Sequence, residues 1–414
     1  MDANTKRRDS IIMKRIRQGL LPALVLSALI GFTGNAHADA GFRNWINDFY
    51  ATAAKSGITK KTYNAAFAGV TEPDPEVLEK ARYQPEFKSK IWDYLDSRVN
   101  PFTVSVGREM AAKHQNTLAA IERSSGIDRN ILLAIWSMES NYGAALEKHD
   151  RLHNVPRALA TLGYADSRRA KFARTQLVAA LKILQNGDVS AKGLMGSWAG
   201  AMGHTQFIPT SYLLYAVDAD GNGRKDIWNS VPDALATAAN LLKKNGWQSG
   251  KTWGYEVALP NGGAKHDGKT MTLAQWAKLG YTRPNGKGFP RPDERAELKL
   301  LGGPNGPGFL MTRNFFIIKR YNAADSYALA VGLLADEIAG YGGVHQKWPR
   351  PNNSLDVKEK FELQTRLKAM GYYDGNIDGN FGSGSKAAIT ALQSRLGLET
   401  DGEPSRHLLD KLRK

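Results

Sequence analysis

The chain has 414 residues, of which 42% are hydrophobic and 23% charged, which excludes an intrinsically disordered protein and leaves room for a large domain with an appendage. It contains no cysteine, which excludes disulfides and thiol chemistry. The formal net charge is +16, and because the first 38 residues carry six basic and two acidic residues, the remainder keeps about +12. The basic residues are dispersed and form no nucleic-acid-binding signature, so no nucleic acid partner is expected.

The first 38 residues have the pattern of a signal peptide. Lys14, Arg15 and Arg17 precede the apolar stretch Leu20–Phe32, which is about a dozen residues long and too short to span a bilayer. Small residues in Ala36-His37-Ala38 predict cleavage after Ala38, with an uncleaved signal anchor as the alternative. Because a lipid anchor needs a cysteine, we expect no membrane anchor after cleavage and a periplasmic location, where a basic protein meets the anionic cell wall.

Residues 39–347 are predicted to form the main body of the protein. Apolar residues recur at three- and four-residue spacing over residues 44–54 and 76–99, and further helices are predicted over residues 129–141, 168–185, 232–245 and 326–341. Residues 250–320 are rich in glycine and proline and contain two β-prone runs, Tyr255–Leu259 and Phe315–Ile318. We therefore expect an α+β fold that is mainly helical, with a small β-containing lobe.

Glu139 ends the apolar run Ile131–Met138 of a predicted helix, for which Asp128 is the expected N-cap and Gly143 lies just beyond the end. The helix is apolar on nearly every side, so we expect it to be buried. A carboxyl group there is costly unless it is paired or protonated, and partial burial raises its pKa, as a general acid for a glycosidic oxygen requires. The alternative is that Glu139 lies in an exposed last turn or pairs with an arginine.

A glycine-rich segment, residues 197–212, is the second feature. Its glycines allow the backbone to approach a ligand closely, and the Gln206 amide offers both a donor and an acceptor. By itself this segment is equally compatible with a turn between helices.

Together these features resemble the lysozyme-like superfamily of lytic transglycosylases, in particular the membrane-bound lytic murein transglycosylase B type. The matching segments run from about residue 84 to residue 327 and so cover most of the main body. They are Gln84-Pro85-Glu86-Phe87, Trp92-Asp93-Tyr94-Leu95, Glu139-Ser140, Arg168-Arg169, Ala199-Gly200-Ala201-Met202-Gly203 with Gln206-Phe207, and Tyr321-Asn322 with Tyr327.

The resemblance implies an enzyme that cleaves the bond between N-acetylmuramic acid and N-acetylglucosamine in peptidoglycan strands. Glu139 would protonate the leaving oxygen, and its carboxylate would then deprotonate the C6 hydroxyl, which closes a 1,6-anhydro ring. Such a monomeric enzyme needs no cofactor for catalysis. Ordinary glycosidases use two carboxylates, and no acidic residue between Glu139 and Gln206 lies in a motif that marks a second one. A muramidase that adds water and a non-catalytic wall-binding scaffold protein are the alternatives.

The resemblance also implies roles for other polar residues of the main body. The groups that would hold Glu139 and the substrate amide are Ser197 and Gln206. The groups that would line the sugar subsites are Tyr94, Tyr321, Asn322 and Tyr327. The groups that would contact a lactyl or peptide carboxylate are Arg168 and Arg169. The tyrosines could instead belong to the core, and the arginines to a solvated helix face.

Residues 218–226 have the spacing of an EF-hand calcium loop, with acidic or amide groups at positions 1, 3, 5 and 9 and glycine at position 6. The residues assigned to this metal site are Asp218, Asp220, Asn222, Arg224, Asp226 and Asp233. Position 12 is Asn229 instead of the usual glutamate, and Asp233 one turn later could substitute. The family that the chain resembles has a calcium site here, which implies structural calcium; the alternative is a solvated turn rich in aspartate.

Residues 348–356 are predicted to be a linker, and residues 357–414 a second domain. The pair Leu-Gln recurs at 363–364 and 392–393, and Asp-Gly recurs at 374–375, 378–379 and 401–402. This pattern resembles the peptidoglycan-binding-like module, a small all-α domain of three helices with two similar halves. Such a tethered domain raises the effective concentration of the wall near the active site. The alternative is a helical oligomerisation tail.

Overall fold

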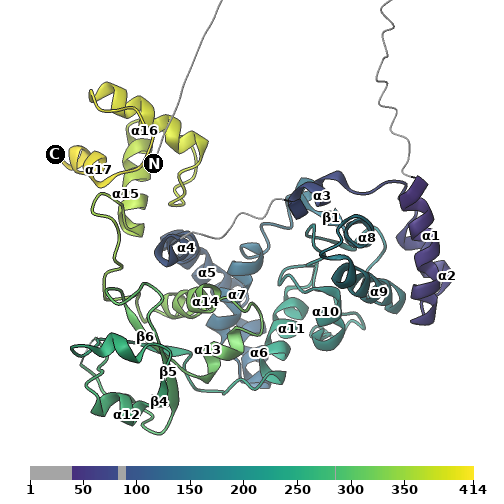
Figure 1. Cartoon of the computed structure of the whole chain (residues 1–414), viewed down its shortest axis with the longest axis horizontal. Coiled ribbons are helices and arrows are strands. Elements are labelled where there is room, and N and C mark those ends of the chain that lie inside the picture. The colour runs from purple at the N-terminus through teal and green to yellow at the C-terminus, as the bar shows by residue number, and fades with distance from the viewer. Residues whose placement is uncertain (1–39, 83–89, 285) are drawn as a thin grey trace, which may run out of the picture. The chain divides into compact units, whose positions relative to one another are not determined.

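Helices dominate the computed structural model, which describes residues 40–82, 90–284 and 286–414 (Figure 1). The predicted signal peptide and the segment Gln84–Phe87 lie outside the described residues. In the described ranges, no helix combines the length and the apolar character needed to cross a membrane. The helices before the C-terminal module are α1 (Ala40–Lys55), α2 (Lys60–Ala66), α3 (Pro75–Arg82), α4 (Ile91–Arg98), α5 (Pro101–Lys113), α6 (Gln115–Ser125), α7 (Arg129–Ser140), η1 (His149–Arg151), α8 (Val155–Ala165), α9 (Ala170–Asn186), α10 (Pro209–Tyr215), α11 (Val231–Lys244), η2 (Gly263–His266), α12 (Leu273–Lys278), α13 (Arg313–Ile318) and α14 (Asp325–Ile338).

Most of the helices predicted from periodicity are present in the structure. Those over residues 44–54, 129–141, 168–185, 232–245 and 326–341 correspond to α1, α7, α9, α11 and α14. The periodic stretch 76–99 contains two helices, α3 and α4, on either side of a segment outside the described residues.

Helix α7 lies in the core of the main body and carries Glu139 in its last turn. Asp128 begins the helix as predicted, because its side chain accepts a hydrogen bond of 2.7 Å from the backbone nitrogen of Asn130. Residues 131–137 are all buried, as expected for a helix that is apolar on nearly every side. Helix α14 packs against α7, and residues 327–335 of α14 are buried in the same core (Figure 1). The packing of α7 against α14 therefore fixes where Glu139 lies relative to the residues of α14.

A short antiparallel pair, β1 (His153–Asn154) with β2 (Met195–Gly196), joins two distant parts of the chain. His153 pairs with Gly196, so the loop that follows α7 ends beside the start of the glycine-rich segment. Within that segment, isolated bridges link Met202 to Gly196 and to Phe207. The glycine-rich segment is therefore held by backbone pairing rather than left as an open turn.

Residues 254–311 form the expected β-containing lobe. Its antiparallel sheet has the order β3–β6–β5–β4, from β3 (Gly254–Val257), β4 (Thr270–Thr272), β5 (Arg295–Lys299) and β6 (Gly308–Met311). Leu310 of β6 pairs with Tyr255 of β3 on one side and with Leu298 of β5 on the other. A separate hydrophobic cluster gathers Val257, Leu298 and Leu310 around Trp276 of α12. The predicted strand over Tyr255–Leu259 is thus found as β3.

Residues 315–318, predicted as a strand, belong to helix α13, so that prediction was wrong. Phenylalanine and isoleucine favour strands in many settings, but tertiary contacts override this preference. Phe315 and Ile318 lie one helical turn apart and are both fully buried. The neighbouring Asn314 fixes the turn, because its amide nitrogen donates to the carbonyl oxygens of Gln248 and Lys251 at 2.9 and 2.8 Å.

The C-terminal module consists of three helices with a hydrophobic core of their own. They are α15 (Val357–Ala369), α16 (Ser383–Arg395) and α17 (Arg406–Arg413). Its two halves repeat one contact: the amide oxygen of Gln364 accepts from Gly379 N at 2.7 Å, and that of Gln393 accepts from Gly402 N at 2.9 Å. The recurring Leu-Gln and Asp-Gly pairs therefore meet in space, which confirms the internal repeat.

Candidate active site

Glu139 lies at the C-terminal end of α7 and faces the partner helix α14. Its Oε1 accepts a hydrogen bond of 2.5 Å from the hydroxyl group of Tyr327. Burial raises the pKa of Glu139 from its ordinary value to about 7, although the bond from Tyr327 and the positive charge of Arg98 lower it. A carboxyl group with this pKa is partly protonated near neutral pH, so it can act both as an acid and as a base.

Three tyrosines that were predicted to line the sugar subsites surround this carboxyl group. Tyr94 comes from α4, Tyr327 from α14, and Tyr321 from the turn before α14. The pKa of each is raised, first by burial and also by the charge of Glu139, which places all three in its electrostatic neighbourhood. The Tyr321 hydroxyl donates to the carbonyl oxygen of Thr205 at 2.6 Å. The tyrosines thus keep neutral hydroxyl groups and apolar rings around the acid.

Glu139, Ser197 and Gln206 line one pocket of about 250 Å³, so the structure brings these three candidate residues together. Ser197 begins a tight turn in which its Oγ accepts from Ala201 N at 3.0 Å. Gln206 has a left-handed backbone with φ of 50°, and its amide nitrogen donates to Gly203 O at 2.9 Å. Such a conformation is strained in a residue other than glycine, and strain of this kind is concentrated at functional sites.

The last two turns of α7 are tied to the glycine-rich segment through His204. Ser140 Oγ donates to the carbonyl oxygen of His204 at 2.6 Å, and the indole nitrogen of Trp136 donates to its Nδ1 at 3.2 Å. Burial lowers the pKa of His204, and nearby His114 lowers it further against the opposing charge of Asp226, which favours the neutral ring that such an acceptor requires. These bonds fix the distance between the end of α7 and the segment that carries Gln206.

Other predicted residues are placed elsewhere. Asn322 is exposed in the turn before α14, where its Oδ1 accepts from Ala324 N at 3.1 Å. The guanidinium groups of Arg168 and Arg169 donate to the carbonyl oxygen of Ala81 at 3.3 and 3.2 Å. Arg169 also pairs with Asp166 at 2.6 Å. None of these residues is among those that line the pocket around Glu139.

Two cations that no sequence pattern marked, Lys148 and Arg151, do line this pocket. They lie in the loop between α7 and β1, which carries no recognised motif. Arg98, whose charge acts on Glu139, is a third cation, and its guanidinium group lies 6.0 Å from the ring centre of Tyr94. The folded structure thus brings Lys148 and Arg151 into the lining of the Glu139 pocket, and Arg98 close enough for its charge to act on the carboxyl group.

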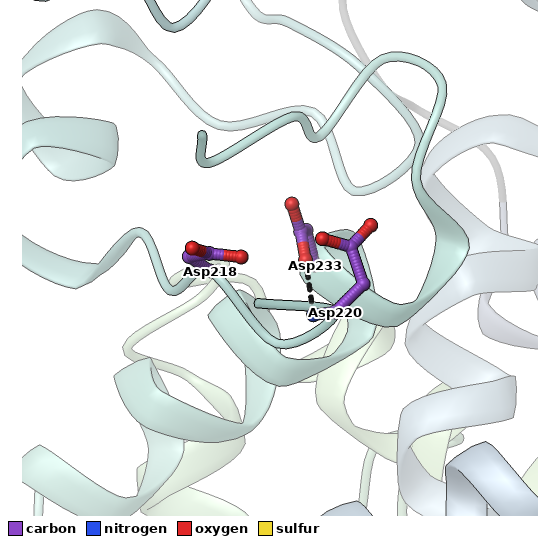
Figure 2. A group of neighbouring side chains, drawn as sticks. All are labelled: Asp218, Asp220 and Asp233. Atoms are coloured by element: carbon purple, nitrogen blue, oxygen red, sulfur yellow. Dashed lines mark hydrogen bonds between the residues drawn. The ribbon is translucent and has the colours of Figure 1, made fainter. Parts of the chain in front are cut away.

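The predicted calcium loop brings three carboxylates together, drawn in Figure 2. Asp218, Asp220 and Asp233 each offer an oxygen within 4.8 Å of the others, a spacing that a cation with ligands at about 2.4 Å can bridge. Backbone donors shape the group, because Asp233 Oδ1 accepts from Ala219 N at 2.8 Å and from Asp220 N at 3.3 Å. Asp233, which the sequence placed as the substitute for position 12, is therefore part of the cluster.

The other residues assigned to the metal site, Asn222, Arg224 and Asp226, lie outside the group of three carboxylates. Asn222 Oδ1 accepts from Arg224 N at 2.9 Å, and the Arg224 side chain is exposed. Asp226 Oδ1 accepts from Trp228 N and Asn229 N at 3.0 and 2.9 Å. Asp226 is accordingly engaged in the turn before α11 and is not one of the three clustered carboxylates.

The sequence of the chain matches two known protein families. Residues 41–336 match the transglycosylase SLT domain family, and residues 359–412 match the peptidoglycan binding domain family. Membrane-bound lytic murein transglycosylase B of Escherichia coli K12 is 31% identical over 252 residues, which cover 59% of this chain and 66% of that protein, just under two thirds of its length.

Two solved structures extend the comparison. SltB3 from Pseudomonas aeruginosa, in complex with NAG-anhNAM-pentapeptide, is 44% identical with a TM-score of 0.71, and the match covers 90% of this chain and 99% of that one. The Escherichia coli lytic transglycosylase Slt35 in complex with calcium is 25% identical with a TM-score of 0.58, over 73% of this chain and 93% of that one. The chain, matched over more than half its length, belongs to the transglycosylase SLT domain family.

Proposed function

We propose that this protein is a lytic transglycosylase that cleaves the bond between N-acetylmuramic acid and N-acetylglucosamine in peptidoglycan. One observation carries the proposal: Glu139 has a pKa of about 7 and is the sole carboxyl group among the described residues that line its pocket. A single carboxyl group does not provide the pair that ordinary glycosidases need. It does suit a reaction in which the same group first gives and then takes a proton.

In the first step, protonated Glu139 gives its proton to the glycosidic oxygen, and the C1–O bond breaks. The N-acetyl group of the muramic acid residue stabilises the positive charge at C1. In the second step, the Glu139 carboxylate takes the proton from the C6 hydroxyl while that oxygen bonds to C1. The product is a 1,6-anhydro sugar, no water is added, and Glu139 ends protonated for the next cycle.

Surrounding residues support both steps. Tyr327 donates to the carboxylate that the first step creates, and Ser197 and Gln206 lie where they can position the substrate amide. The relative SltB3 was solved with a fragment that carries an anhydro sugar, which is consistent with this product. Asn322, Arg168 and Arg169 are not among the residues that line the pocket, and we propose that they contact the substrate beyond it.

Digestion of purified sacculi tests the proposal against its two alternatives. Wild-type protein should release fragments that are one water lighter than reducing-end fragments by mass spectrometry. The Glu139→Gln variant, which cannot donate or accept that proton, should release almost none. Reducing-end products would identify a hydrolytic muramidase, and a wild-type protein without any product would identify a non-catalytic scaffold.

We further propose the division into a signal peptide (residues 1–38), a catalytic domain (39–347), a linker (348–356) and a wall-binding domain (357–414). The Ala-His-Ala sequence at residues 36–38 supports export, and the match of residues 359–412 supports wall binding. The mature protein would then act in the periplasm as a monomer without a membrane anchor. Retention on sacculi, compared with and without residues 348–414, tests the role of the last domain.

Calcium is proposed as a structural ion held by Asp218, Asp220 and Asp233. Their mutual spacing fits the ligand distances of this ion, and the relative Slt35 was solved with calcium. The cluster is separate from the residues that line the Glu139 pocket, so the ion would stabilise the fold around α11 and take no part in proton transfer.

A further inference from the structure

The loop between α7 and β1 contributes two positively charged side chains to the lining of the Glu139 pocket. The pocket is lined by Glu139, Asn141, Ala144, Ala145, Leu146, Lys148, Arg151, Leu152, Ser197 and Gln206. Lys148 and Arg151 are both exposed, and the structure gives neither side chain a hydrogen bond or an ion pair with any described residue. Two unpaired cations in the lining of a pocket whose one described carboxyl group is Glu139 create a site that favours an anionic ligand.

The fold holds these cations in place relative to the catalytic group. Lys148 caps the short helix η1, and Arg151 ends it, with Arg151 N donating to Lys148 O at 2.9 Å. In such a turn, side chains three residues apart lie on the same side, so both cations face one direction. Leu152, the next residue, precedes the β1–β2 pair, whose other strand leads directly into Ser197. The cation-bearing turn is therefore linked through backbone pairing to a residue of the pocket.

The acid itself does not need these charges. Burial, Tyr327 and Arg98 set the pKa of Glu139. Arg169, the inner of the two arginines assigned from sequence to a substrate carboxylate, already pairs with Asp166. Lys148 and Arg151 thus remain available for a group on the substrate.

We propose that Lys148 and Arg151 form a subsite for the carboxylates borne by the lactyl arm of the muramic acid residue, and that this subsite makes the enzyme prefer substrates with that anionic arm. The proposal rests on the proposed glycan-cleaving function. The carboxylate could be that of the lactyl group itself in a strand without peptide, or those of the stem peptide. Both sources share one chemistry, and lysine and arginine are the side chains that bind it.

Binding of three soluble glycans to the full chain tests the subsite. The chain carries Glu139→Gln so that no substrate is consumed, and calorimetry measures Kd. The ligands are a peptide-bearing muramyl disaccharide, the same disaccharide with a free lactyl carboxylate, and an N-acetylglucosamine tetramer without a carboxylate. Adding Lys148→Gln and Arg151→Gln should weaken binding of a carboxylate-bearing ligand about tenfold and leave the tetramer unchanged, a loss typical of charge-assisted hydrogen bonds.

The pattern of losses distinguishes the two sources. Weaker binding of the peptide-bearing ligand alone assigns the stem peptide, and weaker binding of the ligand with a free lactyl carboxylate alone assigns the lactyl group, because the stem peptide is joined through that carboxyl as an amide. Equal weakening of both muramyl ligands shows that the subsite accepts either carboxylate. Unchanged Kd values for both muramyl ligands, or equal losses for all three glycans, would overturn the proposal. Lys148→Arg with Arg151→Lys should restore binding, and Lys61→Gln, which removes an exposed charge on α2, is the matched control.

Kinetics on sacculi separate this inference from the proposed function. In the background with an intact Glu139, the double variant should raise KM and leave kcat within about twofold, because the lost contact binds the substrate before and during reaction. Failure of the wild type to release anhydro products would refute the proposed function. Anhydro products from the wild type with an unchanged KM in the double variant would refute only the subsite.

Discussion

The Tyr327 hydroxyl group donates a 2.5 Å hydrogen bond to Oε1 of Glu139, across the interface between α14 and α7. This bond favours the carboxylate, whereas burial favours the neutral acid and has the larger effect. The balance of these two influences leaves the pKa of Glu139 at about 7. Tyr327 therefore helps to determine the pH at which Glu139 loses its proton, and so the pH at which the proposed general acid would be lost.

Replacing Tyr327 by phenylalanine should shift the pH profile to higher pH. The variant loses a bond that lowers the pKa of Glu139, so the acid stays protonated at higher pH and the alkaline limb of kcat/KM moves up. A bond of typical net strength corresponds to a shift of about 0.5–1 pH unit. Rates of anhydro-product release, measured from pH 5 to 9, give the position of the alkaline limb of kcat/KM. A limb that stays in place or moves down would exclude this role, and Tyr50→Phe serves as a control remote from the site.

The Glu139→Gln variant should be more stable than the wild type at alkaline pH. The folded pKa is about 7, against an ordinary value of 4.5, so between these values the folded protein retains a proton that the unfolded chain has released. The free energy of unfolding of the wild type therefore falls as the pH rises through this window. Because glutamine cannot ionise, the free energy of unfolding of the Glu139→Gln variant does not fall in this window.

Because Glu139 is partly exposed, the expected difference is about 2 kcal/mol at pH 8.5, less than the full pKa shift implies, and near zero at pH 4. Urea unfolding at both pH values measures it. Glu79→Gln, at an exposed position of α3, should show no such pH dependence. Equal stability of the Glu139→Gln variant and the wild type at pH 8.5 would contradict the burial of the charge.

Gly143→Ala should damage the site more than an equivalent change in a free turn. Gly143 has a φ of 93°, and an added Cβ would lie 2.6 Å from the imidazole of His204. Gly57 has a similar φ of 84° but no neighbour within 4 Å, so Gly57→Ala reports the backbone strain of about 1–2 kcal/mol alone. The expected result is a lower Tm for Gly143→Ala than for Gly57→Ala, together with at least a tenfold loss of kcat. Equal Tm values would show that His204 moves freely.

Calcium should raise the Tm of the wild type, and magnesium should not. A ligand at one hundred times its Kd that binds only the folded state stabilises it by about 2.7 kcal/mol. Asp220→Asn removes one clustered charge at an exposed position and should abolish the shift, whereas Asp48→Asn on α1 should keep it. Thermal melts in excess calcium or in chelator provide the measurement. The same shift in Asp220→Asn and the wild type would place calcium elsewhere.

The sequence predicted helix α7, which carries Glu139, more fully than the residues that surround it. Asp128 and the apolar run after it are local signals, so α7 and the terminal position of Glu139 follow from them. Tyr327 lies 188 residues further along the chain, and only the resemblance to a family placed it near Glu139. Lys148 and Arg151 were missed because no periodicity or motif marks which part of an irregular loop returns to a pocket. Residues 315–318 were mistaken for a strand because packing outweighed local preference.

The way α7 ends has a consequence for its carboxyl group. Asn141 and Tyr142 adopt left-handed conformations with φ of 51° and 56°, so the helix stops directly after the turn that carries Glu139. The aligned peptide dipoles place about half a unit of negative charge at that terminus, which disfavours a carboxylate by about 0.3–1 kcal/mol. The position of the helix end, set by the backbone of Asn141 and Tyr142, therefore raises the pKa of Glu139, as burial does. Helix α7 therefore both positions the Glu139 carboxyl group and favours its protonated form, which is the form that the proposed first step requires.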